Sequence, residues 1–161
     1  MLRNKPARLA LLVGALALAL LALFYPTDEK RVRQAAEALV AGVNDSPETL
    51  AQALDQHALP NVTVSVADLP EPLVGRSVLV DAARQALPLG PRLKLRIEAV
   101  EVRVEGKRAR LNADLVASQA EVPELRRPRH SVLLFEKHAD GFRLTSAEIG
   151  AERQDQPEAR P

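Results

Sequence analysis

The sequence predicts an α+β domain in which three helices pack on a bent, mostly antiparallel sheet, preceded by an N-terminal transmembrane helix. Three observations support this prediction. Residues 9–25 form an uncharged apolar run, residues 27–86 hold three helix-period stretches, and the apolar period changes to two after Pro91. Because amphipathic helices and half-buried strands must each bury one face, they pack as layers around a shared core.

The composition excludes several kinds of site. The 161 residues include no Cys and only 2% aromatic residues, which leaves no disulfide, no thiolate metal site and no base-stacking platform. Three of the 22 basic residues, Arg3, Lys5 and Arg8, precede residue 25 with no acid among them, so 19 basic and 21 acidic residues follow. Nucleic-acid-binding domains normally carry a basic excess. We therefore expect no nucleic-acid partner.

The apolar run at residues 9–25 predicts a membrane anchor. As a helix it spans about 25 Å, at the short end of what crosses a hydrocarbon core of about 30 Å. The anchor positions include Leu9, Gly14, Leu18, Phe24 and Tyr25. A cleaved signal peptide is the alternative, but the bulky pair Phe24 and Tyr25 ends the run where a small-x-small cleavage site would be needed. We therefore favour an uncleaved anchor.

The positive-inside rule orients this anchor. The basic residues before the run place residues 1–8 in the cytoplasm as a short stub, and residues 26–149 form a domain outside it. Residues 150–161 are polar and without periodicity, which predicts a disordered tail. The Ala-, Arg- and Leu-rich composition is typical of a bacterial protein. We therefore expect a single-pass protein of the inner membrane with a periplasmic domain.

Three helices are predicted ahead of the long strands. Thr27 and Ser46 cap the first two, because their hydroxyls can accept a hydrogen bond from the next turn. The predicted helical segments are residues 27–45, 46–59 and 75–86. Gly42 is expected to help end the first helix. A half-buried strand at residues 61–67 and a loop at residues 68–72 separate the second and third helices.

Four long strands are predicted after Pro91. The apolar residues of the first change parity once, from Leu93, Leu95 and Ile97 to Val100, Val102 and Val104. A bulge near residues 98–99 would put both sets on one core. Without it, one set would form an apolar surface for self-association on the convex face of the sheet. The later strands are expected at residues 109–115, 130–138 and 142–149, with a polar loop at 120–128 and a turn at Asp140 and Gly141.

This element order resembles the nuclear-transport-factor-2-like superfamily, a cone-shaped α+β fold. The resemblance covers residues 27–149 and rests on the segments VGRSVLVDAARQAL, AVEVRVEGKRARLNADL and LLFEKHADGFRL. Phe142 occupies the place where the family typically has an aromatic residue after a Gly turn. None of these segments is a catalytic motif, and the fold hosts many functions.

The resemblance also implies a candidate for catalysis. Isomerases and cyclases of the superfamily use a cavity carboxylate as general base shortly after the first strand, and Asp68 is at the matching position. Such an enzyme also needs a hydrogen-bond donor for the developing oxyanion, and the single Tyr is Tyr25 at the membrane boundary. By strand parity, Asp114 should point away from the core. An enzyme with Asp68 as base is therefore the alternative function.

The sequence favours a non-catalytic binding or assembly-scaffold domain, part of an envelope complex. The histidines His57, His130 and His138 lack the spacing of a metal site, so we expect no metal and no cofactor. His57 is expected near a helix end. Arg126, Arg127 and Arg129 lie near acidic residues, which favours a solvated loop. The expected partners are the lipid bilayer through residues 9–25 and a protein or second copy, and a small-molecule ligand is left open.

Alkaline phosphatase fused after residue 161 should be active, and the fusion should keep its original N-terminus. The reason is the uncharged run without a cleavage site, which the positive-inside rule orients outward. Phosphatase assays and N-terminal sequencing check this. A chain that starts near residue 26, or an inactive cytoplasmic fusion, would contradict the anchor.

Overall fold

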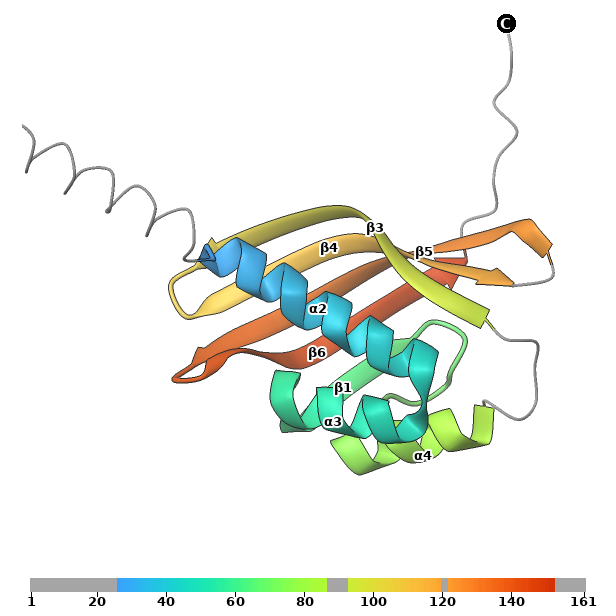
Figure 1. The fold of residues 1–161 in the computed structure, drawn as a ribbon, viewed down its shortest axis with the longest axis horizontal. Coiled ribbons are helices and arrows are strands. Elements are labelled where there is room, and N and C mark those ends of the chain that lie inside the picture. The colour runs from blue at the N-terminus through green and yellow to red at the C-terminus, as the bar shows by residue number, and fades with distance from the viewer. Residues whose placement is uncertain (1–25, 87–92, 120–121, 153–161) are drawn as a thin grey trace, which may run out of the picture.

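The computed structural model describes residues 26–86, 93–119 and 122–152, which form three helices and a six-stranded mixed sheet (Figure 1). The helices are α2 (Asp28–Asp45), α3 (Pro47–His57) and α4 (Arg76–Ala86). The strands are β1 (Ala58–Val66), β2 (Leu73–Val74), β3 (Leu93–Glu105), β4 (Arg108–Gln119), β5 (Val122–His138) and β6 (Gly141–Glu152). The predicted α+β class is confirmed.

The predicted anchor at residues 9–25 and the stub before it lie outside the described residues. Within the described part of the chain, no helix combines the length and the apolar character needed to cross a membrane. Most of the predicted tail also lies outside the description. Its first residues, however, belong to β6, which runs to Glu152 and so extends three residues beyond the expected strand.

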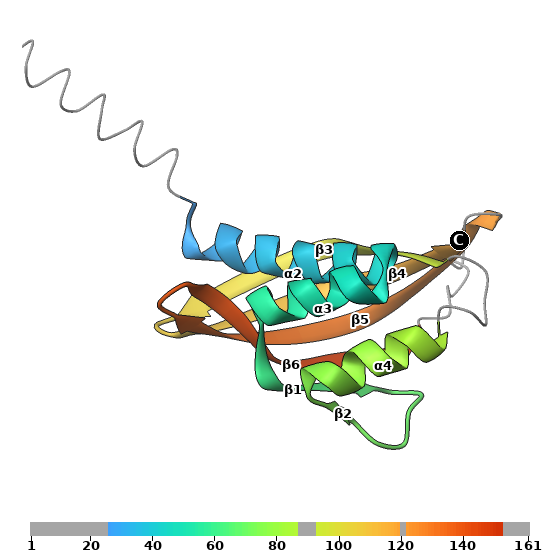
Figure 2. The same ribbon diagram turned by 60° about the horizontal axis from the view of Figure 1, so that its bottom comes forward.

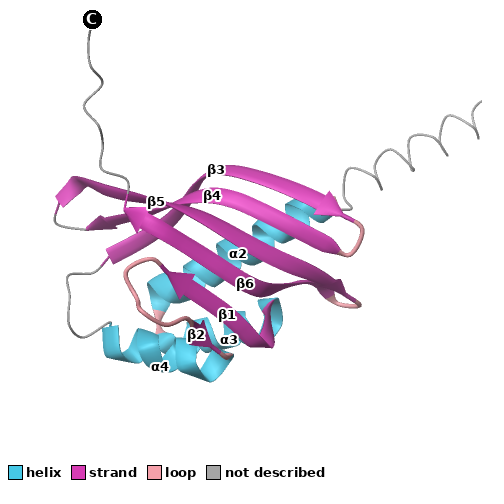
Figure 3. Cartoon of the chain, turned by 180° about the vertical axis from the view of Figure 1, so that it is seen from behind, coloured by secondary structure: helices cyan, strands magenta, loops and turns pink. Residues whose placement is uncertain are grey.

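The sheet has the order β2-β1-β6-β5-β4-β3. β1 pairs with β6 in parallel, and the other neighbours are antiparallel. α2 and α3 lie on one face of the sheet, and α4 lies beside β1 and β2 (Figures 1 and 2). The opposite face of β3 to β6 has no described helix over it (Figure 3). The core therefore lies between the helix layer and one face of the sheet.

β3 contains the predicted bulge. The pairing with β4 shifts between Glu98 and Glu101, and Ala99 has a φ of 50°, the only positive φ of a residue other than glycine in the described chain. Both apolar sets of β3 consequently reach the core. Ile97 packs against it from one side of the bulge, and Val100, Val102 and Val104 pack against it from the other. The valines therefore supply no outward apolar surface.

The two helix caps are confirmed, but Gly42 has another role than expected. The hydroxyl of Thr27 accepts a hydrogen bond from the Lys30 N–H at 3.3 Å, and that of Ser46 accepts one from the Thr49 N–H at 3.1 Å. Gly42 does not end α2, which continues to Asp45. A Cβ at Gly42 would lie 3.0 Å from the Leu50 Cα, so the glycine permits the close approach of α2 to α3.

Other strand boundaries also differ from the sequence expectation, and β4 continues to Gln119 where an end at residue 115 was expected. β1 begins at Ala58, directly after α3, and includes Pro60, which lies where the β1–β6 register is interrupted. Leu73 pairs with Val64 as part of β2, within a stretch for which no strand was predicted. The predicted loop at residues 120–128 is largely strand, because β5 starts at Val122 and its backbone pairs with β4. Backbone pairing there does not require alternating apolar residues, so the polar sequence concealed it.

β3 is an edge strand whose backbone is partly covered by a side chain of α2. The Asn44 amide donates to the Leu95 carbonyl oxygen at 2.8 Å and accepts from the Leu95 N–H at 2.7 Å. The side chain thus makes the two hydrogen bonds that a neighbouring strand would make. Covering edge groups in this way is a common protection of exposed strands.

Substitution of Ala99 by Gly should raise the free energy of unfolding by about 0.5–1 kcal/mol. A left-handed conformation costs an L-residue roughly 1–2 kcal/mol, and the extra flexibility of glycine in the unfolded chain offsets part of the gain. Urea unfolding of residues 26–152 measures the change. Ala117→Gly, in extended β4, is the matched control and should lower stability by about the same amount. Equal destabilisation by both substitutions would contradict the bulge geometry.

Candidate functional site

An apolar hollow of about 250 Å³ lies between the helix layer and the sheet. Its walls come from α2, α3, α4 and five strands, and small residues create the space. These are Ala36, Ala83, Ala113 and Ala147, which lie on α2, α4, β4 and β6 respectively. Among the described residues, the lining includes no charged side chain and no aromatic ring. We call this hollow the cone cavity.

Ser131 is the single polar residue among the described residues that line the cone cavity. It is buried, and its hydroxyl donates to the Arg129 carbonyl oxygen at 3.2 Å. The hydroxyl proton is therefore used within β5. None of the described side chains that line the cavity would act as a general base or carry a formal charge toward a ligand.

The structure places Asp68 outside the cone cavity. Its carboxylate forms an ion pair with Arg129 at 2.6 Å, its side chain is 60% exposed, and it is not among the residues that line the cavity. Arg129 also donates to the Gly150 carbonyl oxygen, at 3.4 Å. Asp68 thus helps to join the end of β1 to β5. The carboxylate is held at the surface instead of against the apolar space.

A cross-strand pair was missed by the sequence analysis. Asp114 on β4 is in register with His130 on β5, and their side chains approach to 3.6 Å. Asp114 does not line the cone cavity, whereas its neighbours Ala113 and Leu115 do. This agrees with the strand parity, which directs Asp114 away from the core. The signal that would have found the pair is the strand register, which is not visible in the spacing of the histidines.

A second hollow, of about 550 Å³, is polar and lies near the start of α2. Three separate segments meet there: the first half of α2, the last turn of α3, and the turn that joins β5 to β6. The lining residues are Arg31, Gln34, Ala35, Asp55, Gln56, His57, Asp140, Gly141, Phe142 and Arg143. We call this hollow the polar cleft.

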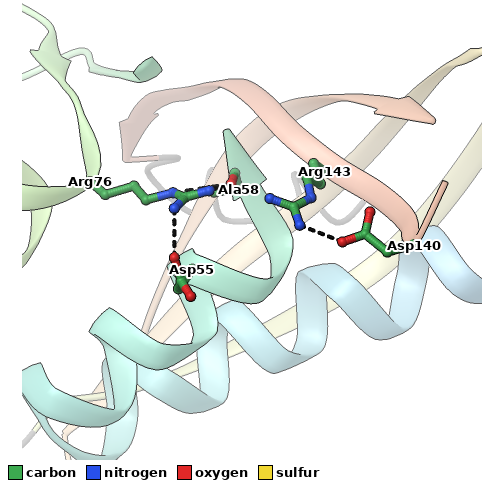
Figure 4. Close-up of polar contacts among 5 residues, drawn as sticks. All are labelled: Asp55, Ala58, Arg76, Asp140 and Arg143. Atoms are coloured by element: carbon green, nitrogen blue, oxygen red, sulfur yellow. Dashed lines mark hydrogen bonds and ion pairs between the residues drawn. The ribbon is translucent and has the colours of Figure 1, made fainter. Parts of the chain in front are cut away.

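Two ion pairs lie on either side of the junction between α3 and β1 (Figure 4). On one side, Arg76 contacts Asp55 at 2.7 Å, and its Nε donates to the Ala58 carbonyl oxygen at 3.1 Å. On the other side, Arg143 donates to Asp140. This hydrogen bond holds the pKa of Asp140 below its ordinary value. Both carboxylates of the polar cleft are therefore engaged by arginines.

His57 lies in the last turn of α3, at the helix end where the sequence placed it. Partial burial is the main cause that lowers its pKa from the ordinary 6.5, and the positive charge of Arg143 lowers it further. The negative end of the helix dipole acts in the opposite direction, because it favours the charged form. His57 is therefore neutral at neutral pH and offers one N–H donor to the polar cleft.

The comparisons with known proteins support the fold. No protein-family model matches the chain, and no curated protein matches it in sequence. An NTF2-like protein of unknown function from Pseudomonas putida KT2440 superposes with a TM-score of 0.66 at 10% identity, covering 83% of this chain and 96% of its own. At 17% identity and a TM-score of 0.62, a proposed dehydratase of the NTF2-like family from Streptomyces avermitilis covers 79% of this chain and 98% of its own.

A CaMKII hub from S. rosetta superposes equally well, with a TM-score of 0.62 at 17% identity, over 78% of this chain and 96% of its own. Other similar structures are described as having a cystatin-like fold. The chain therefore has the NTF2-like, or cystatin-like, fold. At these identities the likeness establishes the fold and not the function.

The free energy of unfolding should fall as the pH is lowered from 8 toward 5.5, and His57→Gln should reduce this fall. The unfolded chain binds a proton at His57 near pH 6.5, whereas the folded chain binds it only at lower pH, so acid favours unfolding. Urea unfolding at several pH values measures the slope. Gln56→Ala is the control, because it alters the same cleft without a titratable group. If the free energy of unfolding of His57→Gln depends on pH as steeply as that of the unaltered chain, the lowered pKa of His57 would be contradicted.

Proposed function

We propose that the chain is a non-catalytic binding domain whose cone cavity holds an apolar ligand or apolar group. The single observation that supports this is the lining of the cavity, which is about 250 Å³ in volume and has no charged side chain among the residues that the structure describes. We further propose that residues 9–25 hold the domain at the periplasmic side of a bacterial inner membrane, as the sequence predicts.

The size and chemistry of the cone cavity favour a small apolar occupant. Empty cavities lined by aliphatic side chains stay dry, and one of about 150 Å³ is large enough to bind benzene. The cone cavity is larger, and the Ser131 hydroxyl already donates its hydrogen bond to the Arg129 carbonyl oxygen within β5. A polar ligand would lose its hydration there without gaining hydrogen bonds. An apolar ring or a short alkyl chain makes no hydrogen bonds with water, so it would not incur this desolvation cost.

The alternative is a cyclase-like or isomerase-like enzyme with Asp68 as general base. A general base must lie within hydrogen-bond reach of the proton that it removes. Asp68 is paired with Arg129 and does not line the cone cavity. The resemblance to a proposed dehydratase rests on fold alone. These observations favour binding over catalysis.

A second copy of the chain is the assembly partner that we propose for a scaffold role. One similar structure is a hub by description, which supports association of this fold in at least one protein. The valines of β3 face the core, so any apolar contribution must come from elsewhere on the helix-free face. Leu134 of β5 is 41% exposed and alternates with Leu133, which lines the cone cavity. Leu134 is therefore available on that face.

Benzene should bind to residues 26–152, and Ala83→Leu should weaken its binding at least tenfold by filling the cone cavity. A chain of this size buries roughly two thirds of its unfolded surface, so we expect the fragment to fold alone. Methyl chemical shifts in a benzene titration measure the affinity. Ala86→Leu is the matched control, because Ala86 is exposed at the end of the same helix and does not line the cavity.

Two results would contradict the proposal. One is that benzene causes no saturable shifts in the folded fragment. The other is that Ala83→Leu and Ala86→Leu bind benzene as well as the unaltered fragment does. A cooperative thermal transition by circular dichroism confirms that each variant is folded before it is titrated.

A further inference from the structure

The polar cleft differs from the cone cavity in every chemical respect. Its base includes the buried side chains of Ala35 and Phe142, and its walls carry Arg31, His57 and Arg143 together with amide and carboxylate groups. An amphiphilic hollow of about 550 Å³ with converging charged groups is the usual form of a specific ligand site. Nothing in the proposed apolar function uses these groups.

The charged groups of the polar cleft are unevenly paired. Two arginines, Arg31 and Arg143, and two carboxylates, those of Asp55 and Asp140, line it, and Arg76 reaches Asp55 from outside the lining. Asp55 is engaged by Arg76, and Asp140 is engaged by Arg143. Among the described residues, Arg31 makes no ion pair and its side chain makes no hydrogen bond. Arg31, a half-buried residue of the cleft lining, therefore has its guanidinium available to an incoming anion.

Arg143 also has unused hydrogen-bonding capacity. Its guanidinium carries five N–H donors, of which the Asp140 carboxylate occupies one side. Its Nε is buried and has no hydrogen-bond partner among the described residues. A buried donor without a partner costs free energy, so such a group needs an explanation. A modest rotation of the side chain toward a bound acceptor in the cleft would satisfy it.

We propose that the polar cleft binds an oxyanion, most simply a phosphate group, held by the guanidinium groups of Arg31 and Arg143. Guanidinium groups match the geometry of phosphate oxygens and form short charge-assisted hydrogen bonds with them. Gln34, Gln56 and the neutral imidazole of His57 supply further N–H donors around the same space. The apolar base accommodates the uncharged part of a phosphate ester.

Two sources of the phosphate fit this site. The cleft lies beside the start of α2, and this helix begins two residues after the first described residue. A chain anchored through residues 9–25 would therefore hold the cleft near the membrane surface. A phospholipid headgroup is one source, and a soluble phosphate compound is the other. The binding chemistry is the same for both. The inference goes beyond the proposed function, because it requires neither an occupied cone cavity nor the anchor.

The test titrates the full chain in maltoside detergent, which contains no phosphate, with inorganic phosphate at constant ionic strength. Isothermal titration calorimetry should give a saturable isotherm. Arg31→Gln should weaken the affinity roughly tenfold or more, because a hydrogen bond to a charged group contributes about 1.5–3 kcal/mol. Lys30→Gln is the matched control: it removes the same charge from the adjacent position, and Lys30 is exposed and does not line the cleft. It should change the affinity little.

A parallel titration in phosphatidylcholine nanodiscs distinguishes the two sources. Suppressed binding of inorganic phosphate there would support the site and assign it to a lipid headgroup. Undiminished binding would support the site and assign it to a soluble compound. The proposal would be overturned if the chain in maltoside shows no saturable binding, or if Lys30→Gln and Arg31→Gln weaken binding equally. Because the Arg31 side chain makes no ion pair and no hydrogen bond with the described residues, its replacement should change the thermal transition little.

Discussion

The bulge in β3 is the constraint on which the rest of the domain depends. A single left-handed residue, Ala99, reverses the parity of the strand, so that apolar residues on both sides of it face the same core. α2 can then pack against β3, and Leu95 and Ile97 can form part of the cavity wall. Without this one residue, half of the strand would present its apolar side to the wrong face of the sheet.

Features encoded within a few residues were predictable from the sequence, and features encoded by long-range contacts were not. The caps at Thr27 and Ser46, the parity change at the bulge and the turn at Gly141 each have a local chemical cause. The start of β5 and the short β2 depend on a partner strand, which supplies hydrogen bonds whatever the side-chain pattern. The polar cleft was missed because its three segments are far apart in the chain, and Asp140 with Arg143 is their only local signal.

Both α2 and α3 contribute residues to the cone cavity and to the polar cleft. On α2, Ala35 lines the polar cleft and its neighbour Ala36 lines the cone cavity. On α3, Asp55 lines the polar cleft and its neighbour Leu54 lines the cone cavity. Helical geometry turns successive residues by about 100°, which allows one helix to serve two sites. A shift of either helix would therefore alter both hollows together. Gly42, which lets α2 and α3 approach closely, limits such shifts.

The amide of Asn44 has a consequence for how copies of this chain can assemble. A sheet with a free edge can grow by strand addition, in which an extended peptide or a neighbouring molecule continues the hydrogen-bond ladder. At Leu95 that ladder is already terminated, because both backbone groups are bonded to Asn44. An added strand would have to displace this side chain and break two hydrogen bonds. Strand addition to β3 at Leu95 is thereby disfavoured.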